Sequence, residues 1–289
     1  MTLWTLLAEQ PAYFLTLATV LGLLVGSFLN VLVYRLPIML ERQWQREAQE
    51  MLELPITPHE RFDLWLPASR CPHCAHRIRA WENIPVISYL ALRGRCSACK
   101  TRISPRYPLV EVASALLSLV VAWRFGASPE ALLALPLTWC LLALSLIDAE
   151  HQLLPDALVL PMLWLGLIVN AFGLYIPLAS ALWGAVAGYL SLWSVYWLFK
   201  LVTGKEGMGY GDFKLLAMVG AWGGWQVIPL TVLFSSLVGA VLGLLLLRLR
   251  RLKGGSPIPF GPYLAIAGWI ALLWGGQITA SYWQFTGLR

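Results

Sequence analysis

Residues 12–36 of the chain read AYFLTLATVLGLLVGSFLNVLVYRL, with Arg35 as their single charged residue. An α-helix needs about 20 apolar residues to cross a bilayer, so this stretch predicts a membrane-spanning helix. No basic region precedes the stretch, and no small-residue cleavage site follows it. We therefore interpret it as a retained helix and not as a removed signal peptide.

Apolar stretches of this kind recur along most of the chain. Hydrophobic residues make up 58% of the sequence and charged residues only 12%, whereas a soluble domain carries about 25% charged residues. The predicted fold is therefore an all-α polytopic membrane protein with about eight transmembrane helices. At Gly223-Gly224 the pattern leaves a second interpretation open, in which one kinked span is followed by a re-entrant segment. The predicted spans cover residues 12–36, 108–125, 130–147, 157–177, 181–201, 213–224, 227–248 and 260–282.

The polar segment after the first span holds most of the positive charge. Residues 35–107 contain 12 of the 21 Lys and Arg residues, and such residues collect on the cytoplasmic side of a membrane. We therefore predict an N-terminal transmembrane helix (1–36), a cytoplasmic insertion (37–107) and a transmembrane domain (108–289). With eight spans, both termini are periplasmic and the basic loop 248–259 is cytoplasmic. The net charge of +6 is explained in this way, and no nucleic-acid partner is predicted.

The insertion contains two CxxC pairs, Cys71-Pro-His-Cys74 and Cys96-Ser-Ala-Cys99. Two such pairs are typical of a structural zinc site with four thiolate ligands, although a redox pair or a disulfide remains an alternative. A cytoplasmic location disfavours disulfides. His73 and His76 could replace a thiolate, but with four cysteines available we expect both to be exposed. We identify no internal repeat. The predicted metal is Zn²⁺, with the ligands Cys71, Cys74, Cys96 and Cys99.

Two aspartates lie at the edges of predicted spans. Asp148 ends the third span, and Asp212 opens the sixth in the motif Gly209-Tyr-Gly211-Asp212. Two apposed carboxylates share a proton, so one can act as a base on water while the other polarises a scissile carbonyl. Gly209 and Gly211 are expected to let a substrate backbone approach closely. We predict Asp148 and Asp212 as a catalytic pair, whereas Asp156 is expected to be a helix N-cap.

These residues belong to longer motifs that make the chain similar to a known family. It resembles the type IV prepilin peptidases, the bifunctional leader peptidase/N-methyltransferases of the GxGD aspartyl protease type. The resemblance extends over most of the chain. Its motifs are Gly26-Ser-Phe-Leu-Asn30, Ser69-Arg-Cys-Pro72, Glu82-Asn-Ile-Pro85, Leu92-Arg-Gly-Arg-Cys96, Ile103-Ser-Pro-Arg-Tyr-Pro108, Ile147-Asp148, Leu154-Pro-Asp156 and Gly209-Tyr-Gly-Asp212.

The resemblance implies an enzyme of the bacterial inner membrane with two activities. It implies cleavage of a short basic leader on the cytoplasmic side, with Asp148 and Asp212 as the aligned catalytic pair. It also implies methylation of the new N-terminal amine with S-adenosylmethionine as donor. The implied substrates are type IV prepilins or type II secretion pseudopilins, embedded in membrane lipid. The four cysteines match the members that have both functions.

No motif in the sequence identifies a site for the methyl donor. By analogy with the family alone, Glu82, Asn83, Arg93 and Gly94 are candidates. Two other functions compete with this interpretation. A cleavage-only GxGD intramembrane protease is disfavoured by the cysteine insertion. A transporter with the two aspartates as ion ligands is disfavoured because transport sites lie near the bilayer midplane, not at its edge.

Overall fold

The structure is a computed structural model that describes residues 7–55, 60–248 and 259–286. These residues form helices, one short 3₁₀ helix and two isolated bridges, with no strand among them. The helical fold with a cysteine insertion between the first two long helices is therefore confirmed. The chain divides into two compact units, residues 1–139 and 140–289. The predicted division into a first helix, an insertion and a transmembrane domain stays a prediction.

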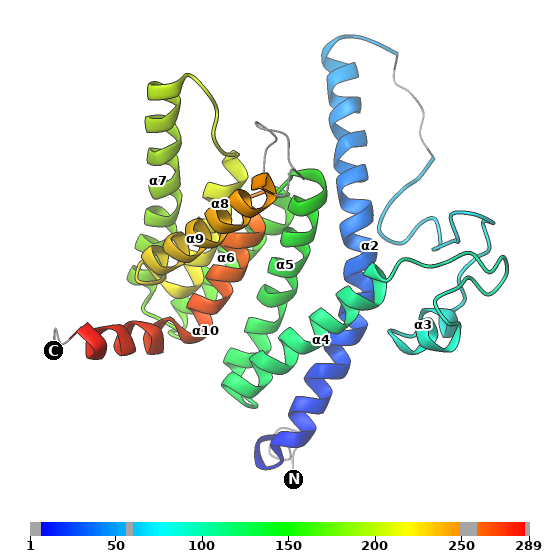
Figure 1. Cartoon of the computed structure of the whole chain (residues 1–289), viewed down its shortest axis with the longest axis horizontal. Coiled ribbons are helices and arrows are strands. Elements are labelled where there is room, and N and C mark those ends of the chain that lie inside the picture. The colour runs from blue at the N-terminus through cyan, green and yellow to red at the C-terminus, as the bar shows by residue number, and fades with distance from the viewer. Residues whose placement is uncertain (1–6, 56–59, 249–258, 287–289) are drawn as a thin grey trace. The chain divides into compact units, whose positions relative to one another are not determined.

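The first unit is organised around two long helices that lie side by side (Figure 1). Glycines allow this close packing, since a Cβ added at Gly22 would lie 2.8 Å from the Cα of Ala115. At Gly26 it would lie 2.7 Å from the Cα of Glu111. Small residues at such contacts are common between membrane helices. The elements of this unit are α2 (Pro11–Met51), η1 (Ala80–Asn83), α3 (Ile87–Ala91), α4 (Arg106–Phe125) and the first part of α5 (Pro129–His151).

Helix α2 continues well beyond the predicted first span. It passes through Pro37, which cannot donate a helical hydrogen bond, and ends only at Met51. The predicted domain boundary at residue 36 therefore lies inside a helix. Buried Arg35 fastens the returning chain to α2, because its guanidinium donates to the backbone oxygens of Asp63 (2.8 Å) and Pro67 (2.6 Å).

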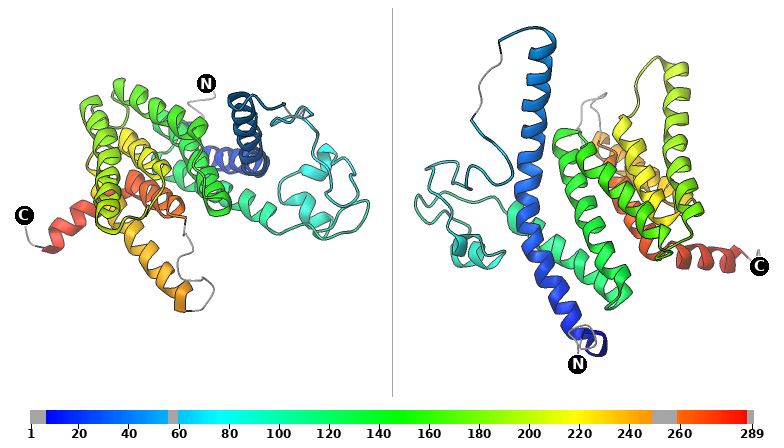
Figure 2. Two further views of the ribbon diagram at one scale, coloured as in Figure 1. Left: turned by 90° about the horizontal axis from the view of Figure 1, so that it is seen from above. Right: turned by 180° about the vertical axis from the view of Figure 1, so that it is seen from behind.

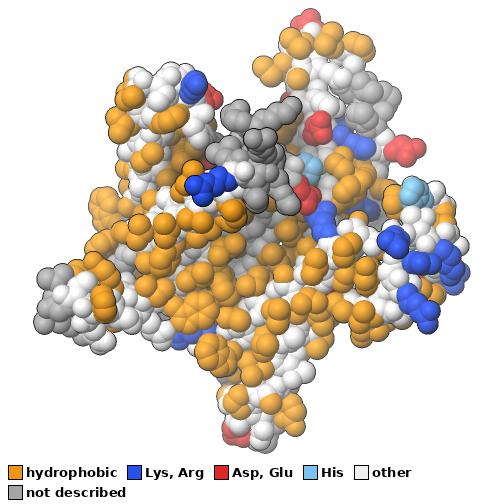
Figure 3. Space-filling view, viewed as in Figure 1, with side chains coloured by type: hydrophobic (Ala, Val, Ile, Leu, Met, Phe, Trp, Pro, Cys, Tyr) orange, Lys and Arg blue, Asp and Glu red, His pale blue; other side chains and the backbone are white. Residues whose placement is uncertain are grey.

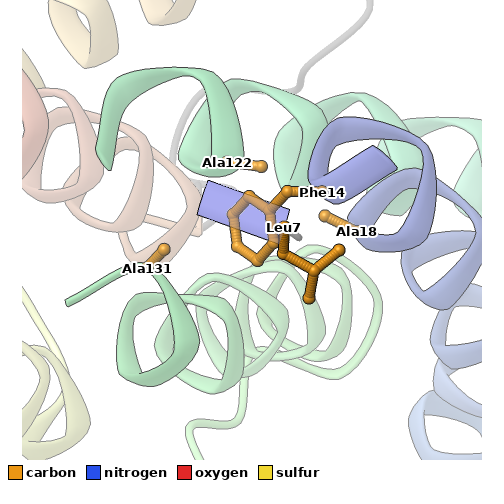
Figure 4. Packing of buried hydrophobic residues seen from close by; sticks show 5 residues of the cluster. All are labelled: Leu7, Phe14, Ala18, Ala122 and Ala131. Carbon is orange, nitrogen blue, oxygen red and sulfur yellow. The ribbon is translucent and has the colours of Figure 1, made fainter. Parts of the chain in front are cut away.

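A small apolar core closes the other end of the first unit. Phe14 of α2 packs with Ala122 of α4 and Ala131 of α5, as Figure 4 shows. Leu7 and Ala18 complete this cluster. The alanines leave room for the single aromatic ring, so three helices approach one another closely.

The second unit surrounds one short, buried helix. Helix α8 packs against α6, α7, α9 and α10, and most of its residues are buried (Figure 2). Gly184 of α7 and Gly220 of α8 are in backbone contact. This burial fixes the position of the GxGD motif at the start of α8. The elements are the end of α5, α6 (Asp156–Ala171), α7 (Leu178–Thr203), α8 (Tyr210–Gly223), α9 (Val227–Arg248) and α10 (Gly261–Thr286).

Eight long helices coincide with the eight predicted spans, but not all of them meet the requirements for crossing a membrane. Six of those described are long and apolar enough to do so. Helix α6 has only 16 residues and α8 only 14, so the eight-span count stays a prediction. A turn at Gly224, with φ of 80°, separates α8 from α9, so residues 213–248 are not one kinked helix. Residues 249–258 and Arg289 lie outside the described part, and the predicted orientation of the termini stays a prediction.

Candidate functional site

The second unit brings Asp148 and Asp212 together from helices far apart in the sequence. Asp148 lies in the last turn of α5 and Asp212 in the first turn of α8. Both residues are buried, with an exposed fraction of 6% for Asp148 and 7% for Asp212. The two carboxyl groups are close enough for the charge on Asp148 to act on Asp212. Two carboxyl groups in such a setting cannot both ionise freely. The arrangement has the components required for acid–base hydrolysis with a shared proton.

A third helix contributes a hydrogen-bond donor to this carboxyl pair. The backbone N–H of Gly261, the first residue of α10, donates to Asp148 Oδ2 at 2.9 Å. Such an N–H has no partner within its own helix, and the helix dipole favours negative charge there. A Cβ at this position would lie 2.7 Å from the same oxygen, so glycine is required. Sequence analysis missed Gly261. The Gly261-Pro262 pair predicts the start of a helix. It does not indicate that this start faces the carboxyl group of Asp148.

Leu154 fills the space between two of the site glycines. A Cβ at Gly211 would lie 2.8 Å from Leu154 Cβ, and one at Gly261 would lie 3.2 Å from Leu154 Cδ2. Gly211 therefore makes room for this side chain of the protein itself. Gly209 is more open, since its nearest neighbour, Asp212 Oδ2, would be 3.9 Å from an added Cβ. Access for a substrate backbone at Gly209 stays a prediction.

An aromatic cluster holds the first turn of α8 in place. The ring of buried Tyr196 contacts the rings of Tyr210 and Phe213, with centroids 5.3 and 5.6 Å away. Lys200 Nζ donates to the Tyr196 hydroxyl at 3.2 Å and to Glu206 Oε1 at 2.8 Å. The hydrogen bond from Lys200 lowers the pKa of Glu206. The loop before the GxGD motif is thus fastened to the end of α7.

Asp156 does not have the role predicted for it. Pro155 is the N-cap of α6 and makes no side-chain cap, whereas Asp156 is the first helical residue. Its carboxylate instead accepts from Lys214 Nζ at 2.7 and 2.8 Å. The N-cap prediction is therefore wrong, because a charged partner on α8 takes this carboxylate.

The four cysteines of the insertion converge in the first unit. Their sulfur atoms all lie within 4.8 Å of one another, with Cys71 and Cys99 at 3.8 Å and Cys74 and Cys96 at 4.0 Å. Zn–S bonds of about 2.3 Å in a tetrahedron place the sulfurs roughly 3.8 Å apart. The residues therefore fit a zinc ion. Cys140, the fifth cysteine, lies elsewhere and is buried.

The cysteine pairs belong to a ten-residue repeat, which contradicts the expectation of no internal repeat. Residues 69–78 read SRCPHCAHRI and residues 94–103 read GRCSACKTRI. Both copies close with the same backbone bonds, since Ile78 N–H donates to Ser69 and Ile103 N–H to Gly94. Each also has an Arg–Arg bridge across its turn. The shared Arg-Cys-x-x-Cys-x-x-Arg-Ile pattern was the signal for this repeat.

Glu82, one of the methyl-donor candidates, lies in the segment that joins the two repeats, and its carboxylate is hydrogen-bonded within the insertion. Its carboxylate accepts from Arg79 N–H at 2.8 Å and lies 3.2 Å from His76 Nε2. The Arg79 bond, followed by a bond to Ser97, lowers the pKa of Glu82 to about 2. His76 is therefore half-buried and not exposed as predicted, whereas His73 is exposed.

Of the other three methyl-donor candidates, Asn83 ends η1, Arg93 precedes the second repeat and Gly94 begins it. Asn83 and Arg93 are exposed, and Arg93 lines a shallow pocket of about 420 Å³ with Ala91, Leu92, Arg95 and Lys100. Gly94 has φ of 65°, and a Cβ there would lie 2.9 Å from the Tyr89 ring. Gly94 thus has a clear structural reason to be glycine. The binding of a methyl donor by these four residues stays a prediction.

A buried pair of aspartates among apolar helices, in a chain that also carries a four-cysteine insertion, is typical of a class of helical membrane enzymes. Comparison with known proteins identifies the family. Residues 20–125 match the bacterial peptidase A24 N-terminal domain, and residues 135–244 match the type IV leader peptidase family. The chain belongs to this family.

Relatives with high identity cover the whole chain. A prepilin leader peptidase/N-methyltransferase of Pseudomonas putida is 76% identical over 99% of this chain and 100% of its own. Proteins of the same description are 66% identical in Pseudomonas aeruginosa, over 100% of both chains, and 51% identical in Burkholderia pseudomallei, over 90% of this chain and 85% of its own. No solved structure matches.

These findings confirm several predictions at once. The family resemblance is confirmed, and so is the enzyme class, a peptidase with N-methyltransferase activity. The six apolar helices and the relatives together indicate a multi-pass protein of the inner membrane.

Proposed function

We propose that this protein removes the leader peptide of type IV prepilins or type II secretion pseudopilins, using Asp148 and Asp212 at the cytoplasmic face of the membrane. It then methylates the new N-terminal amine. The observation that carries the peptidase assignment is the burial of these two carboxyl groups together at the ends of α5 and α8. The names of the relatives support the substrate class.

In the proposed reaction the two carboxyl groups share one proton. The ionised group takes a proton from water, and the water oxygen attacks the carbonyl carbon of the scissile peptide bond. The protonated group donates a hydrogen bond to the carbonyl oxygen, where negative charge develops. A proton then passes to the leaving nitrogen as the C–N bond breaks. Gly261 N–H keeps Asp148 in its orientation throughout.

The methyl transfer requires a donor and an ordered insertion. S-adenosylmethionine supplies the methyl group when bound, and the free amine produced by cleavage accepts it. Zinc held by the four cysteines gives the insertion its shape. Asn83, Arg93 and Gly94 are the proposed donor-site residues. Glu82 acts on the shape of the site, since its carboxylate is already bonded to Arg79 and His76.

The two activities are expected to be separable, because Asp148 and Asp212 belong to the second unit and the cysteine insertion to the first. The test supplies cleaved pilin and labelled S-adenosylmethionine to the purified Asp212→Asn enzyme. We expect labelling close to that of the unchanged protein, with no cleavage of intact prepilin. If no label is transferred, the two reactions share the aspartates and the assignment of separate sites is wrong.

A further inference from the structure

The segment η1–α3 of the insertion leaves a set of apolar side chains uncovered. Ile87 and Leu90 of α3 are 64% and 67% exposed, and Trp81 of η1 is 54% exposed. Ile87 and Leu90 are three residues apart, so they lie on one face of the helix. An exposed apolar cluster in a small polar module marks a contact surface.

Basic side chains lie at the C-terminal end of the same helix. Arg95 and Lys100 line the same shallow pocket as Ala91 and Leu92 at the end of α3. Between Arg70 and Arg106 the sequence has eight Lys and Arg residues and one acidic residue, Glu82. Figure 3 shows Lys and Arg side chains gathered over this part of the insertion. The single carboxylate is bonded within the module, so the face carries an uncompensated positive charge.

The start of α3 is also tied to α4, one of the helices long and apolar enough to cross a membrane. The carboxylate of Glu111, near the start of α4, accepts from the backbone N–H of Val86 at 2.7 Å. Helix α4 has 20 residues, which is about the thickness of the hydrocarbon core, and Glu111 lies roughly 8 Å from its first residue. Because Glu111 is buried, this bond leaves α3 little freedom to move away along the membrane normal.

We propose that the η1–α3 face binds the anionic surface of the bilayer that the protein's own helices cross. Trp81, Ile87 and Leu90 enter the boundary between headgroups and acyl chains, while Arg95 and Lys100 pair with lipid phosphates. Apolar insertion combined with basic residues is the usual chemistry of interfacial membrane binding. The insertion is thereby oriented by lipid as well as by its two connections to α2 and α4.

The test uses the full-length protein, one copy per nanodisc, with a fluorescent amino acid in place of Ile87. Quenching by lipids with a spin label near the headgroup reports contact with the bilayer. A matched control carries the same probe at Gln45, an exposed position on the polar end of α2. Asn30 Nδ2 bonds the backbone oxygen of Tyr107 at the start of α4, and Gln45 lies about 22 Å further along α2. A probe at Gln45 is therefore beyond the reach of the lipid.

We expect strong quenching at position 87 in discs with phosphatidylglycerol, and weaker quenching in pure phosphatidylcholine or at high salt. Arg95→Gln together with Lys100→Gln should weaken the association by about fivefold per residue. Arg93 stays unchanged because of its proposed role in methyl transfer. The matched charge control is Arg46→Gln together with Lys205→Gln, which should leave quenching unchanged. Zinc content verifies that each variant retains the fold of the insertion.

Three results would overturn the proposal. The probe at position 87 could remain unquenched in anionic discs. Quenching could be equal in both lipids and unaffected by salt or by the double variant, which would indicate apolar contact without recognition of charge. The probe could also become shielded only when two copies share a disc, which would make the face a contact between copies of the chain. The lipid and salt comparisons need only the probe-bearing chain, so they decide the matter even if the double variant fails to fold.

Discussion

The cysteine cluster and the aspartate pair are built in opposite ways. All four thiols come from one short stretch of the first unit, and each pair is positioned by the turns of its own repeat. Asp148 and Asp212 lie on different helices of the second unit, and α10 supplies the donor at Gly261. The cysteine site therefore depends on local chain geometry and, as proposed, on a zinc ion, whereas the aspartate site depends on the packing of several helices. This difference predicts that the two sites can be damaged independently.

Removal of either carboxyl group of the proposed catalytic pair should have the largest effect. Asp148→Asn and Asp212→Asn preserve the volume of the side chain but cannot supply acid–base chemistry, so leader cleavage should fall by about 10²–10⁴-fold. Zinc content and membrane insertion should stay normal, because the cysteines belong to the other unit. Cleavage is measured with purified protein and prepilin in detergent. Normal processing by either variant would remove that aspartate from the mechanism.

Loss of one thiol should produce the reverse pattern. The unchanged protein should contain about one zinc ion per chain. Replacement of any one of the four cysteines by Ser should release most of it and loosen the insertion, since structural zinc contributes much of the folding free energy of such small modules. Methylation should be lost while cleavage remains.

Metal analysis and methyl transfer are measured on the same preparations. Cys140→Ala is the matched control, because Cys140 is buried away from the cluster and should not affect zinc. If the unchanged protein holds no zinc and its four thiols react freely in the native state, the metal assignment is wrong. If cleavage also disappears with the zinc, the two sites are not independent.

Gly261→Ala tests the dependence of the aspartate site on packing. The new Cβ would lie 2.7 Å from Asp148 Oδ2, so the carboxyl or the start of α10 must shift. Small displacements of catalytic groups are costly, and we expect cleavage to fall by about 10–100-fold. Gly276→Ala is the control in the same helix, since a Cβ there meets nothing within 4 Å. Equal activity of the two variants would show that the Gly261 contact does not position Asp148.

The same difference explains what could be predicted from the sequence. Spacing alone identified the cysteine site, because its ligands are close in the chain, and apolar runs located the eight long helices. Asp148 and Asp212 were predicted as a pair from their unusual position at span edges and from the family motif, and their catalytic role stays a prediction. Gly261, Leu154 and the Tyr196 cluster were missed, because their roles arise only when separate helices pack. Asp156 was misassigned for the same reason, since its partner lies 58 residues away on α8.

Disruption of the ion pair between Asp156 and Lys214 should have the smallest effect on cleavage, although Lys214 lies only two residues from Asp212 in the sequence. The two side chains are 52% and 32% exposed, and ion pairs of this kind contribute about 1 kcal/mol or less. Asp156→Asn and Lys214→Gln should therefore each keep cleavage within about fivefold of normal. In each single variant the remaining partner can be solvated by water, so the double variant should be no worse than the sum of the two. Cleavage rates and thermal unfolding of the four proteins form the measurement. If Asp156→Asn instead abolishes cleavage while Lys214→Gln does not, Asp156 acts on the substrate directly. The aspartate site would then contain three carboxyl groups drawn from three helices, α5, α6 and α8.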